Sequence, residues 1–223
     1  MSWGFELIDV EKRYGSVRAL DGFDLGARMG SITALVGPAG CGKTTVFRLL
    51  AGLERPDVGA VLVAGKDIGN ARGGRLKKIQ SRMAVVFDAA ADGSHALFGT
   101  ATVLENVEFP MRAVGRVPRR RLELVARTEL DRFGLGALSD ELPGALSRSQ
   151  RKSLALARAF AMKAPLVLVD DLAAGLDGPG LHDVCRLIRE ECTAIGATWF
   201  VTERSAVVAE AVADEVQELV PFV

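Results

Sequence analysis

The chain has 223 residues, of which 49% are hydrophobic and 25% are charged, an ordinary globular composition. This excludes a disordered tail protein, a collagen-like chain and a disulfide scaffold. At roughly 150 residues per domain, we expect one domain, with up to two lobes. Lys and Arg together number 28, as do Asp and Glu, so the net charge is zero and we expect no nucleic-acid partner.

The cysteines and the apolar segments indicate where the protein works. Cys41, Cys185 and Cys192 form no CxxC pair, which argues against a zinc site and favours a reducing compartment. No stretch approaches the roughly 18 uncharged apolar residues of a membrane-spanning helix. Glu6 and Asp9 fall where a signal peptide would need an apolar run. We therefore expect a soluble protein that reaches a membrane only through a partner.

Short apolar runs alternate with helical patterns along the chain. The expected strands are 5–10 and 17–25, an early antiparallel pair, then 32–36, 58–65, 83–87, 166–169 and 198–201. The expected helices are 44–51, 119–133, 150–163 and 184–195. Because apolar strands that alternate with helices form a parallel sheet covered on both faces, the pattern predicts an α/β fold.

Charge is unevenly distributed between these elements. Segments 71–82 and 112–132 are rich in basic residues, and residues 203–218 lean acidic. Such runs are typical of solvated helix faces; the alternative is docking to a partner surface or to anionic lipid headgroups. The low-complexity run 88–94 predicts a flexible loop.

The most informative motif follows the expected strand 32–36 and fits the pattern GxxxxGK[ST]. Glycines allow successive backbone N–H groups to face one anion, and the helix that follows adds its positive N-terminal end. Lys43 would reach the β- and γ-phosphates, and the Thr44 hydroxyl would bind Mg²⁺. The alternative is a Gly-rich turn with no ligand. The predicted nucleotide-binding residues of this loop are Gly37, Pro38, Ala39, Gly40, Cys41, Gly42, Lys43, Thr44 and Thr45.

A second motif supplies acidic residues. The buried strand expected at 166–169 ends in Asp170 and Asp171. In a phosphate-loop protein, Asp170 would complete the Mg²⁺ shell; the alternative is a solvated strand end.

The order of these motifs resembles the ATP-binding subunit of ABC transporters over nearly the whole chain. Tyr14 stands where that family has an aromatic residue that stacks on adenine. The segments that match further family motifs are 37–45 (Walker A), 146–150 (the signature, here LSRSQ), 166–170 (Walker B), 174–177 (the D-loop) and 201–203 (the switch strand). Asp177 of the D-loop would touch the other subunit's site or cap the following helix.

The resemblance implies a phosphate-loop NTPase core with an antiparallel β subdomain and a helical subdomain. It implies one ATP-binding domain over 1–223, with a core lobe formed by 1–89 and 161–223 and a helical lobe over 90–160. It further implies ATP and Mg²⁺ as cofactors, Ser147 and Gln150 as nucleotide-contacting residues, and a second ATP-binding subunit, identical or different. A membrane-spanning subunit would hold the protein at the cytoplasmic face. The run 102–110 is similar to subunits that serve lipid, lipoprotein or division-related systems.

The residues depart from the family pattern where hydrolysis takes place. Asp88 replaces the Q-loop glutamine, from where it could still contact Mg²⁺, and Asp171 replaces the catalytic glutamate. Glu203 replaces the switch histidine, and an ionised carboxylate cannot donate a hydrogen bond. Arg148 and Ser149 replace the two signature glycines.

We therefore expect an ATP-binding subunit of a transport assembly whose hydrolysis is weak or lost and whose role is regulatory or structural. The alternative is an active transport ATPase in which Asp171, Glu203 and Asp88, the candidate catalytic residues, have taken over the chemistry. A soluble kinase or GTPase has less support, since no guanine-reading motif is present.

Overall fold

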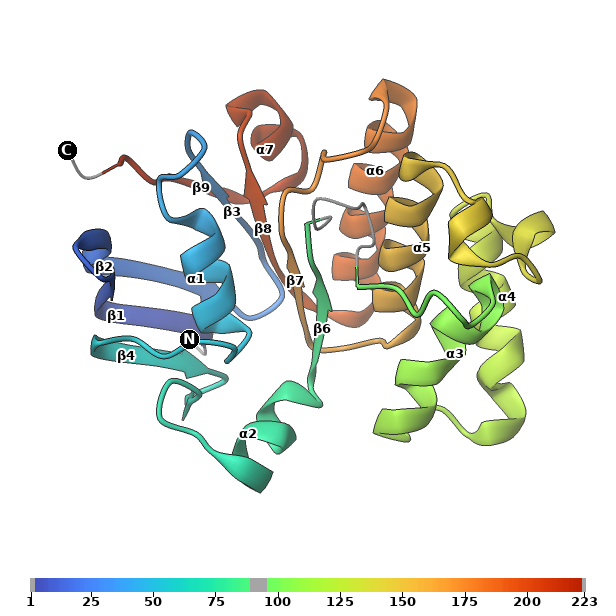
Figure 1. Ribbon diagram of the computed structural model, residues 1–223, viewed down its shortest axis with the longest axis horizontal. Coiled ribbons are helices and arrows are strands. Elements are labelled where there is room, and N and C mark those ends of the chain that lie inside the picture. The colour runs from blue at the N-terminus through green and yellow to red at the C-terminus, as the bar shows by residue number, and fades with distance from the viewer. Residues whose placement is uncertain (1–2, 89–95, 222–223) are drawn as a thin grey trace. The chain divides into compact units, whose positions relative to one another are not determined.

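The computed structural model describes residues 3–88 and 96–221 and divides the chain into two compact units (Figure 1). The first unit contains the chain up to Val85, Pro165–Leu172 and the residues from Val184 onward. The second unit contains Val86–Ala164 and Ala173–Asp183. Apart from Asp88, the loop predicted at 88–94 lies outside the described residues.

An antiparallel sheet occupies the N-terminal part of the first unit. Its strand order is β2-β1-β4-β5, with β1 Trp3–Tyr14, β2 Val17–Arg28, β4 Val58–Val63 and β5 Lys66–Asp67. Tyr14 pairs with Val17, so a two-residue turn joins the first two strands. The early antiparallel pair predicted from the sequence is therefore confirmed.

A second, largely parallel sheet forms the core of the first unit. Its order is β6-β7-β8-β3-β9, with β6 Met83–Val86, β7 Leu166–Val169, β8 Thr198–Glu203, β3 Ile32–Val36 and β9 Glu215–Glu218. The neighbours β7–β8, β8–β3 and β3–β9 run parallel, and every residue of β3, β7 and β8 is buried. The predicted α/β fold is confirmed. Because the carboxyl ends of parallel strands meet at one edge, the residues that follow β3, β7 and β8 lie together.

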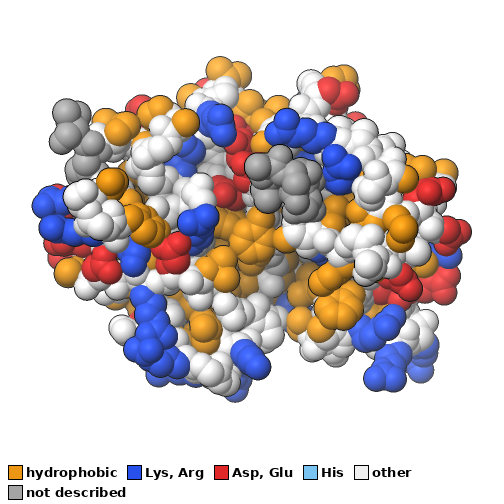
Figure 2. Space-filling view, viewed as in Figure 1, with side chains coloured by type: hydrophobic (Ala, Val, Ile, Leu, Met, Phe, Trp, Pro, Cys, Tyr) orange, Lys and Arg blue, Asp and Glu red, His pale blue; other side chains and the backbone are white. Residues whose placement is uncertain are grey.

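Along the chain, a helix follows each of the strands β3, β5, β7 and β8. They are α1 Lys43–Leu50, α2 Gly73–Gln80, α6 Gly178–Ile195 and α7 Ala206–Val212. The ring centroids of Phe5 and Phe200 lie 5.4 Å apart in an edge-on contact, which packs the antiparallel sheet against the parallel one. Figure 2 shows Lys and Arg side chains gathered where Figure 1 places α2, and this basic segment is exposed, as a solvated face requires.

The second unit is mainly helical. Its longer helices are α3 Val103–Val114, α4 Leu122–Arg132 and α5 Arg148–Ala161. Short 3₁₀ turns lie between them at Arg119–Arg121, Gly136–Leu138 and Pro143–Ala145. Val107, Met111, Leu130 and Leu154 are among the buried residues that form one apolar cluster across the three helices.

Candidate functional site

The loop between β3 and α1 has the geometry of an anion-binding turn. The helix begins at Lys43 with Gly42 as its N-cap, at φ 108°, in the left-handed region that favours glycine. Within the described residues, no side chain caps the first amides of α1. These amides and the positive end of the helix are therefore available to an anionic group.

Two glycines of this loop are required by close contacts. A Cβ at position 37 would lie 2.6 Å from Cys41 Sγ and would overlap the carbonyl oxygen of Leu219. A Cβ at position 42 would lie 2.7 Å from the carbonyl oxygen of Ala19. The loop therefore keeps its backbone close to its neighbours only because these positions carry no side chain.

Lys43 lies over the loop that precedes it. Its Nζ donates hydrogen bonds to the carbonyl oxygens of Gly37, at 2.6 Å, and Pro38, at 2.7 Å. Cys41 Sγ is 3.6 Å from the same nitrogen, and Cys41 is buried. The ammonium group is thus fixed beside the amides of the turn, so one pocket carries both kinds of phosphate donor.

The hydroxyl and carboxylate predicted for Mg²⁺ are brought together. Thr44 Oγ1 lies 3.4 Å from Asp170 Oδ2, although the two residues are 126 positions apart. Thr202, at the end of β8, donates a 2.6 Å hydrogen bond to Asp170 Oδ1. Its oxygen also accepts a 2.9 Å hydrogen bond from the backbone N–H of Asp171. The carboxylate of Asp170 is therefore oriented by a neighbouring strand, with one oxygen facing Thr44.

A pocket of about 310 Å³ extends from the phosphate loop to Tyr14. The Tyr14 hydroxyl donates a hydrogen bond to Glu54, and Lys12 Nζ lies 5.6 Å from the centre of the ring. Arg48 pairs with the same glutamate at 3.3 Å. Burial and, next in size, the bond to Glu54 raise the pKa of the Tyr14 hydroxyl. Tyr14 thus lines the same pocket as the phosphate loop, with its hydroxyl within hydrogen-bonding reach of Thr45.

The substituted hydrolytic residues Asp171 and Glu203 follow β7 and end β8. Asp171 has φ 46° and forms an ion pair with Arg204, with Oδ2 3.1 Å from Nε. Glu203 is 2% exposed; its carbonyl oxygen accepts from the Gly37 N–H, and its Oε2 accepts from the Arg204 N–H. Burial and, secondly, the charge of Glu203 raise the pKa of the Cys185 thiol. Glu203 is therefore an internal carboxylate beside the start of the phosphate loop.

The remaining predicted site residues belong to the second unit. Asp88 follows β6 there, at the edge of the described segment. Ser147 and Gln150 form a reciprocal capping box at the start of α5, with hydrogen bonds of 3.1 Å and 2.8 Å. Gly175 of the D-loop lies against Arg148, since a Cβ there would be 3.5 Å from its Nε. Asp177 accepts from the Gly180 N–H at 2.8 Å, which confirms its predicted capping of the following helix.

The first unit fits a nucleoside triphosphate with Mg²⁺. The turn accommodates no Cβ at Gly37 or Gly42, and Lys43 supplies a cation. Thr44 and Asp170 offer hydroxyl and carboxylate oxygens, the ligands that Mg²⁺ prefers when phosphate supplies the others. Among the described residues, no group of three or more His, Cys, Asp or Glu could hold a metal ion alone.

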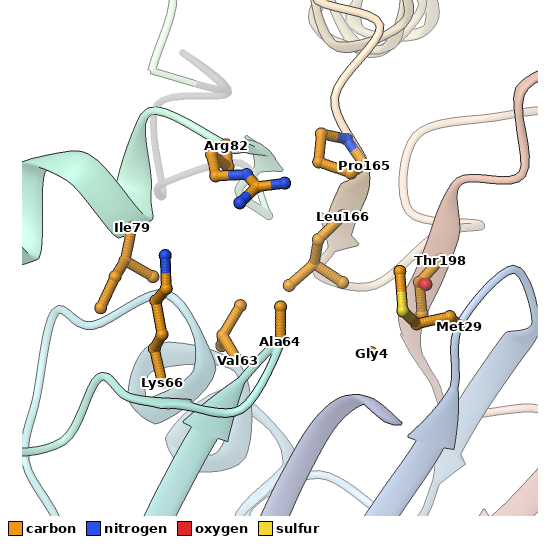
Figure 3. Close-up of a pocket in the computed structure, with 10 residues that line it drawn as sticks. All are labelled: Gly4, Met29, Val63, Ala64, Lys66, Ile79, Arg82, Pro165, Leu166 and Thr198. Atoms are coloured by element: carbon orange, nitrogen blue, oxygen red, sulfur yellow. The ribbon is translucent and has the colours of Figure 1, made fainter. Parts of the chain in front are cut away.

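A second cavity lies elsewhere in the first unit (Figure 3). It has a volume of about 50 Å³ and is lined mainly by apolar side chains, among them Val63 and Leu166. The charged ends of Lys66 and Arg82 lie beside it. This cavity shares no lining residue with the 310 Å³ pocket and is too small for a nucleotide, so the phosphate-loop pocket is the candidate site.

Comparison with known proteins assigns the chain to a family. The model of the ABC transporter family matches residues 20–174, more than half of the chain. The chain belongs to the ABC transporter family. The matched span of this ABC protein includes the phosphate loop, Asp170 and the segment 146–150, whereas Tyr14 and the switch strand 201–203 lie outside it.

Curated relatives of this ABC protein include importers' ATP-binding proteins. The methionine import ATP-binding protein MetN of Mesorhizobium japonicum is 32% identical over 94% of this chain and 56% of its own. The sulfate/thiosulfate import ATP-binding protein CysA of Bordetella bronchiseptica is 37% identical over 82% of this chain and 50% of its own. The chain spans about half the length of the curated relatives it matches.

Solved ABC cassettes share the fold. The chain matches cbiO1 from Clostridium perfringens, part of the ABC transporter complex cbiONQ, with a TM-score of 0.83 and 25% identity over 98% of this chain and 85% of that one. It matches the dimeric ATP-binding cassette MJ0796, bound to ADP and Pi, with a TM-score of 0.86 and 25% identity over 96% and 94%. The expected ABC ATPase fold is confirmed. In residues 3–88 and 96–221, no helix has the length and apolarity needed to cross a membrane.

Sequence reasoning missed three residues of this site. Thr202 orients Asp170, Glu54 binds the Tyr14 hydroxyl and Arg204 pairs with Asp171. Thr202 and Arg204 lie at and just beyond the end of a predicted buried strand. This was the only sequence signal that could have placed them near Asp170 and Asp171, which follow the neighbouring parallel strand. Glu54 gave no signal, because it is 40 residues from Tyr14.

Proposed function

We propose that this chain is the ATP-binding component of an ABC importer, and that it binds Mg–ATP in the first unit and hydrolyses it slowly. The observation that carries the proposal is the 310 Å³ pocket, which is lined by Tyr14 together with Lys43 and Thr44 of the phosphate loop. A nucleotide needs an apolar surface for its base and cationic and amide donors for its phosphates, and this pocket provides both. The import direction rests on the names of the relatives.

Binding would use the residues in the roles that the family motifs suggest. Tyr14 would stack on the base, while the amides of 37–45 and the ammonium of Lys43 would bind the phosphates. Thr44 and Asp170 would hold Mg²⁺, with Asp88 as a further Mg²⁺-contacting candidate. Ser147 and Gln150 would contact nucleotide across a dimer. Bound Mg²⁺ would neutralise phosphate charge.

Slow hydrolysis follows from the two substituted carboxylates. Ionised Glu203 is acceptor-only, so it cannot donate a hydrogen bond to a phosphate oxygen, and its charge opposes the charge that develops there. Asp171 is one methylene shorter than glutamate, and a displacement near 1 Å can cost about 100-fold in rate. The protein would then close on ATP and remain closed, a regulatory or structural role in the assembly.

The assembly would contain a second ATP-binding chain, identical or different, and a membrane-spanning subunit that holds both at the cytoplasmic face. The whole of 1–223 would act as one ATP-binding domain whose two lobes are the core and the helical lobe. Support comes from the dimeric MJ0796 cassette and from the import proteins named above. The basic 112–132 segment remains a candidate docking surface for the membrane partner.

Calorimetric titration of the purified chain with Mg–ATP tests the binding proposal. The wild type should bind, Lys43→Ala should lose at least about ten-fold in affinity, and Lys78→Ala, an exposed lysine of α2, should bind as the wild type does. Equal affinities in all three proteins would contradict the proposal.

A further inference from the structure

Arg204 places a cation on the carboxylate that occupies the position of the family's catalytic glutamate. Its Nε lies 3.1 Å from Asp171 Oδ2. The contact follows from the sheet: β7 and β8 are parallel neighbours in which Val169 pairs with Val201. The residues just beyond these two strands therefore meet at one edge, where Asp171 follows the first and Arg204 the second.

Besides the ion pair, the backbone conformation and one backbone hydrogen bond of Asp171 define its position. Its backbone has φ 46°, a left-handed conformation that Asp and Asn tolerate better than most residues. Its N–H donates to Thr202 Oγ1 at 2.9 Å. The side chain of Asp171 is 16% exposed, whereas that of Arg204 is 64% exposed. The carboxylate is thus mostly buried, and the guanidinium that pairs with it is mostly exposed to solvent.

We propose that Arg204 is a positioning residue that keeps Asp171 in an ion pair and withholds it from water activation. This inference rests on the proposed function and explains its slow hydrolysis by a second, separable cause. A carboxylate oxygen that accepts a charge-assisted hydrogen bond has one lone pair fewer for a water proton, so the guanidinium competes with water for Asp171. Partly exposed ion pairs add little to stability, so the effect is on the chemistry of the site.

The opposite role is also testable. An arginine that left Asp171 for a phosphate oxygen would stabilise bound ATP and speed its cleavage. Removing Arg204 would then weaken ATP binding relative to ADP and slow turnover. The ion-pair proposal requires the reverse, because it assigns the guanidinium to Asp171 and not to the ligand.

The experiment compares Arg204→Ala and Arg204→Lys in the wild-type and Asp171→Asn backgrounds. Asn tolerates the backbone of position 171 and removes the charge. Arg186→Ala is the matched control, since Arg186 is an exposed arginine of α6 that pairs with Glu190. Two quantities are measured with nucleotide: kcat and KM for phosphate release, and the ratio of ATP to ADP affinity. A third needs no nucleotide: the rate at which carbodiimide and a glycine ester label Asp171, read by mass spectrometry.

The proposal predicts that Arg204→Ala raises kcat at least about five-fold, with KM and the affinity ratio changed less than about two-fold. Labelling of Asp171 should also rise, while Arg204→Lys and Arg186→Ala should stay near the wild type. In the Asp171→Asn background, Arg204→Ala should change nothing. An unchanged or lower kcat, or unchanged labelling of Asp171, would overturn the proposal. A wild type that binds no ATP would refute the proposed function alone, because the labelling would still decide whether the pair exists.

Discussion

The hydroxyl of Thr202 donates a 2.6 Å hydrogen bond to Asp170 Oδ1, and both side chains are buried at the carboxyl edge of the parallel sheet. The same hydroxyl accepts from the N–H of Asp171, so one threonine orients two consecutive acidic residues. Thr44 Oγ1 lies 3.4 Å from the other oxygen of Asp170. The proposed Mg²⁺ site therefore depends on a residue that would not itself contact the metal.

Thr202→Val tests this dependence. Valine keeps the shape of the side chain but removes both hydrogen bonds, which should cost about 2 kcal/mol of unfolding free energy. Urea unfolding measures the loss, and Thr202→Ser, which keeps the hydroxyl, should lose less than about 1 kcal/mol. The gain in ATP affinity on adding Mg²⁺ should shrink in the valine variant. Valine and serine variants of equal stability would count against an orienting hydroxyl.

The Tyr14–Glu54 contact gives a pH-dependent prediction, which is accessible because Tyr14 is the only tyrosine in the chain. Burial and the bond to Glu54 raise its pKa above 10.0. The folded state therefore retains this proton better than the unfolded state. The resulting stability is complete below pH 10 and is lost as the pH rises through the folded pKa.

Absorbance at 295 nm, measured while the chain is still folded by circular dichroism, follows the Tyr14 phenolate alone. Glu54→Gln should lower the titration midpoint part of the way, because burial, the larger cause, remains. Glu190→Gln, at an exposed surface pair, is the control. A midpoint that does not move in Glu54→Gln would show that the contact is absent in solution.

Gly37→Ala should disrupt the phosphate loop. The added Cβ would overlap the Leu219 carbonyl oxygen and approach Cys41 Sγ, and such overpacking costs about 1–3 kcal/mol. Thermal unfolding and Mg–ATP titration should show lower stability and weaker binding. Gly74→Ala is the matched control: it lies in α2, its Cβ would meet nothing within 4 Å, and it should gain up to about 1 kcal/mol. Equal behaviour of the two variants would be inconsistent with a tightly packed loop.

A comparison of two capping boxes in the second unit distinguishes a structural role of Ser147 from a functional one. Ser147 caps α5 and Thr102 caps α3 with the same reciprocal geometry. Ser147→Ala and Thr102→Ala should each cost about 1 kcal/mol of unfolding free energy. Light scattering with ATP should show that only Ser147→Ala also weakens ATP-dependent dimerisation, because only Ser147 lies in the signature segment. Equal dimerisation in the two variants would show that Ser147 acts only as a helix cap.

The sequence predicted the features that depend on local pattern. Apolar runs located the buried strands β3, β7 and β8 nearly to the residue, because strands buried on both faces have continuous apolar sequence. The spacing of the glycines and Lys43 located the phosphate loop, whose geometry is local.

Elements that depend on tertiary context were not predicted. Helix α2 begins with two glycines and buries only Ile79, so its sequence has no helical apolar stripe. Strand β9 has four residues that are mostly exposed, and α6 begins at Gly178 and not at Val184, because Asp177 caps a start that contains Pro179 and Gly180. The pairing of Arg204 with Asp171 depends on strand register, which no local pattern encodes.

The most direct test of the account measures Mg–ATP affinity and steady-state phosphate release on the same preparation, for the wild type, Lys43→Ala and Asp171→Asn. We expect Lys43-dependent binding together with phosphate release in the wild type that scarcely exceeds that of Lys43→Ala. Rapid release that needs both Lys43 and Asp171 would contradict it, and would identify an active transport ATPase in which Asp171 has replaced the family's glutamate.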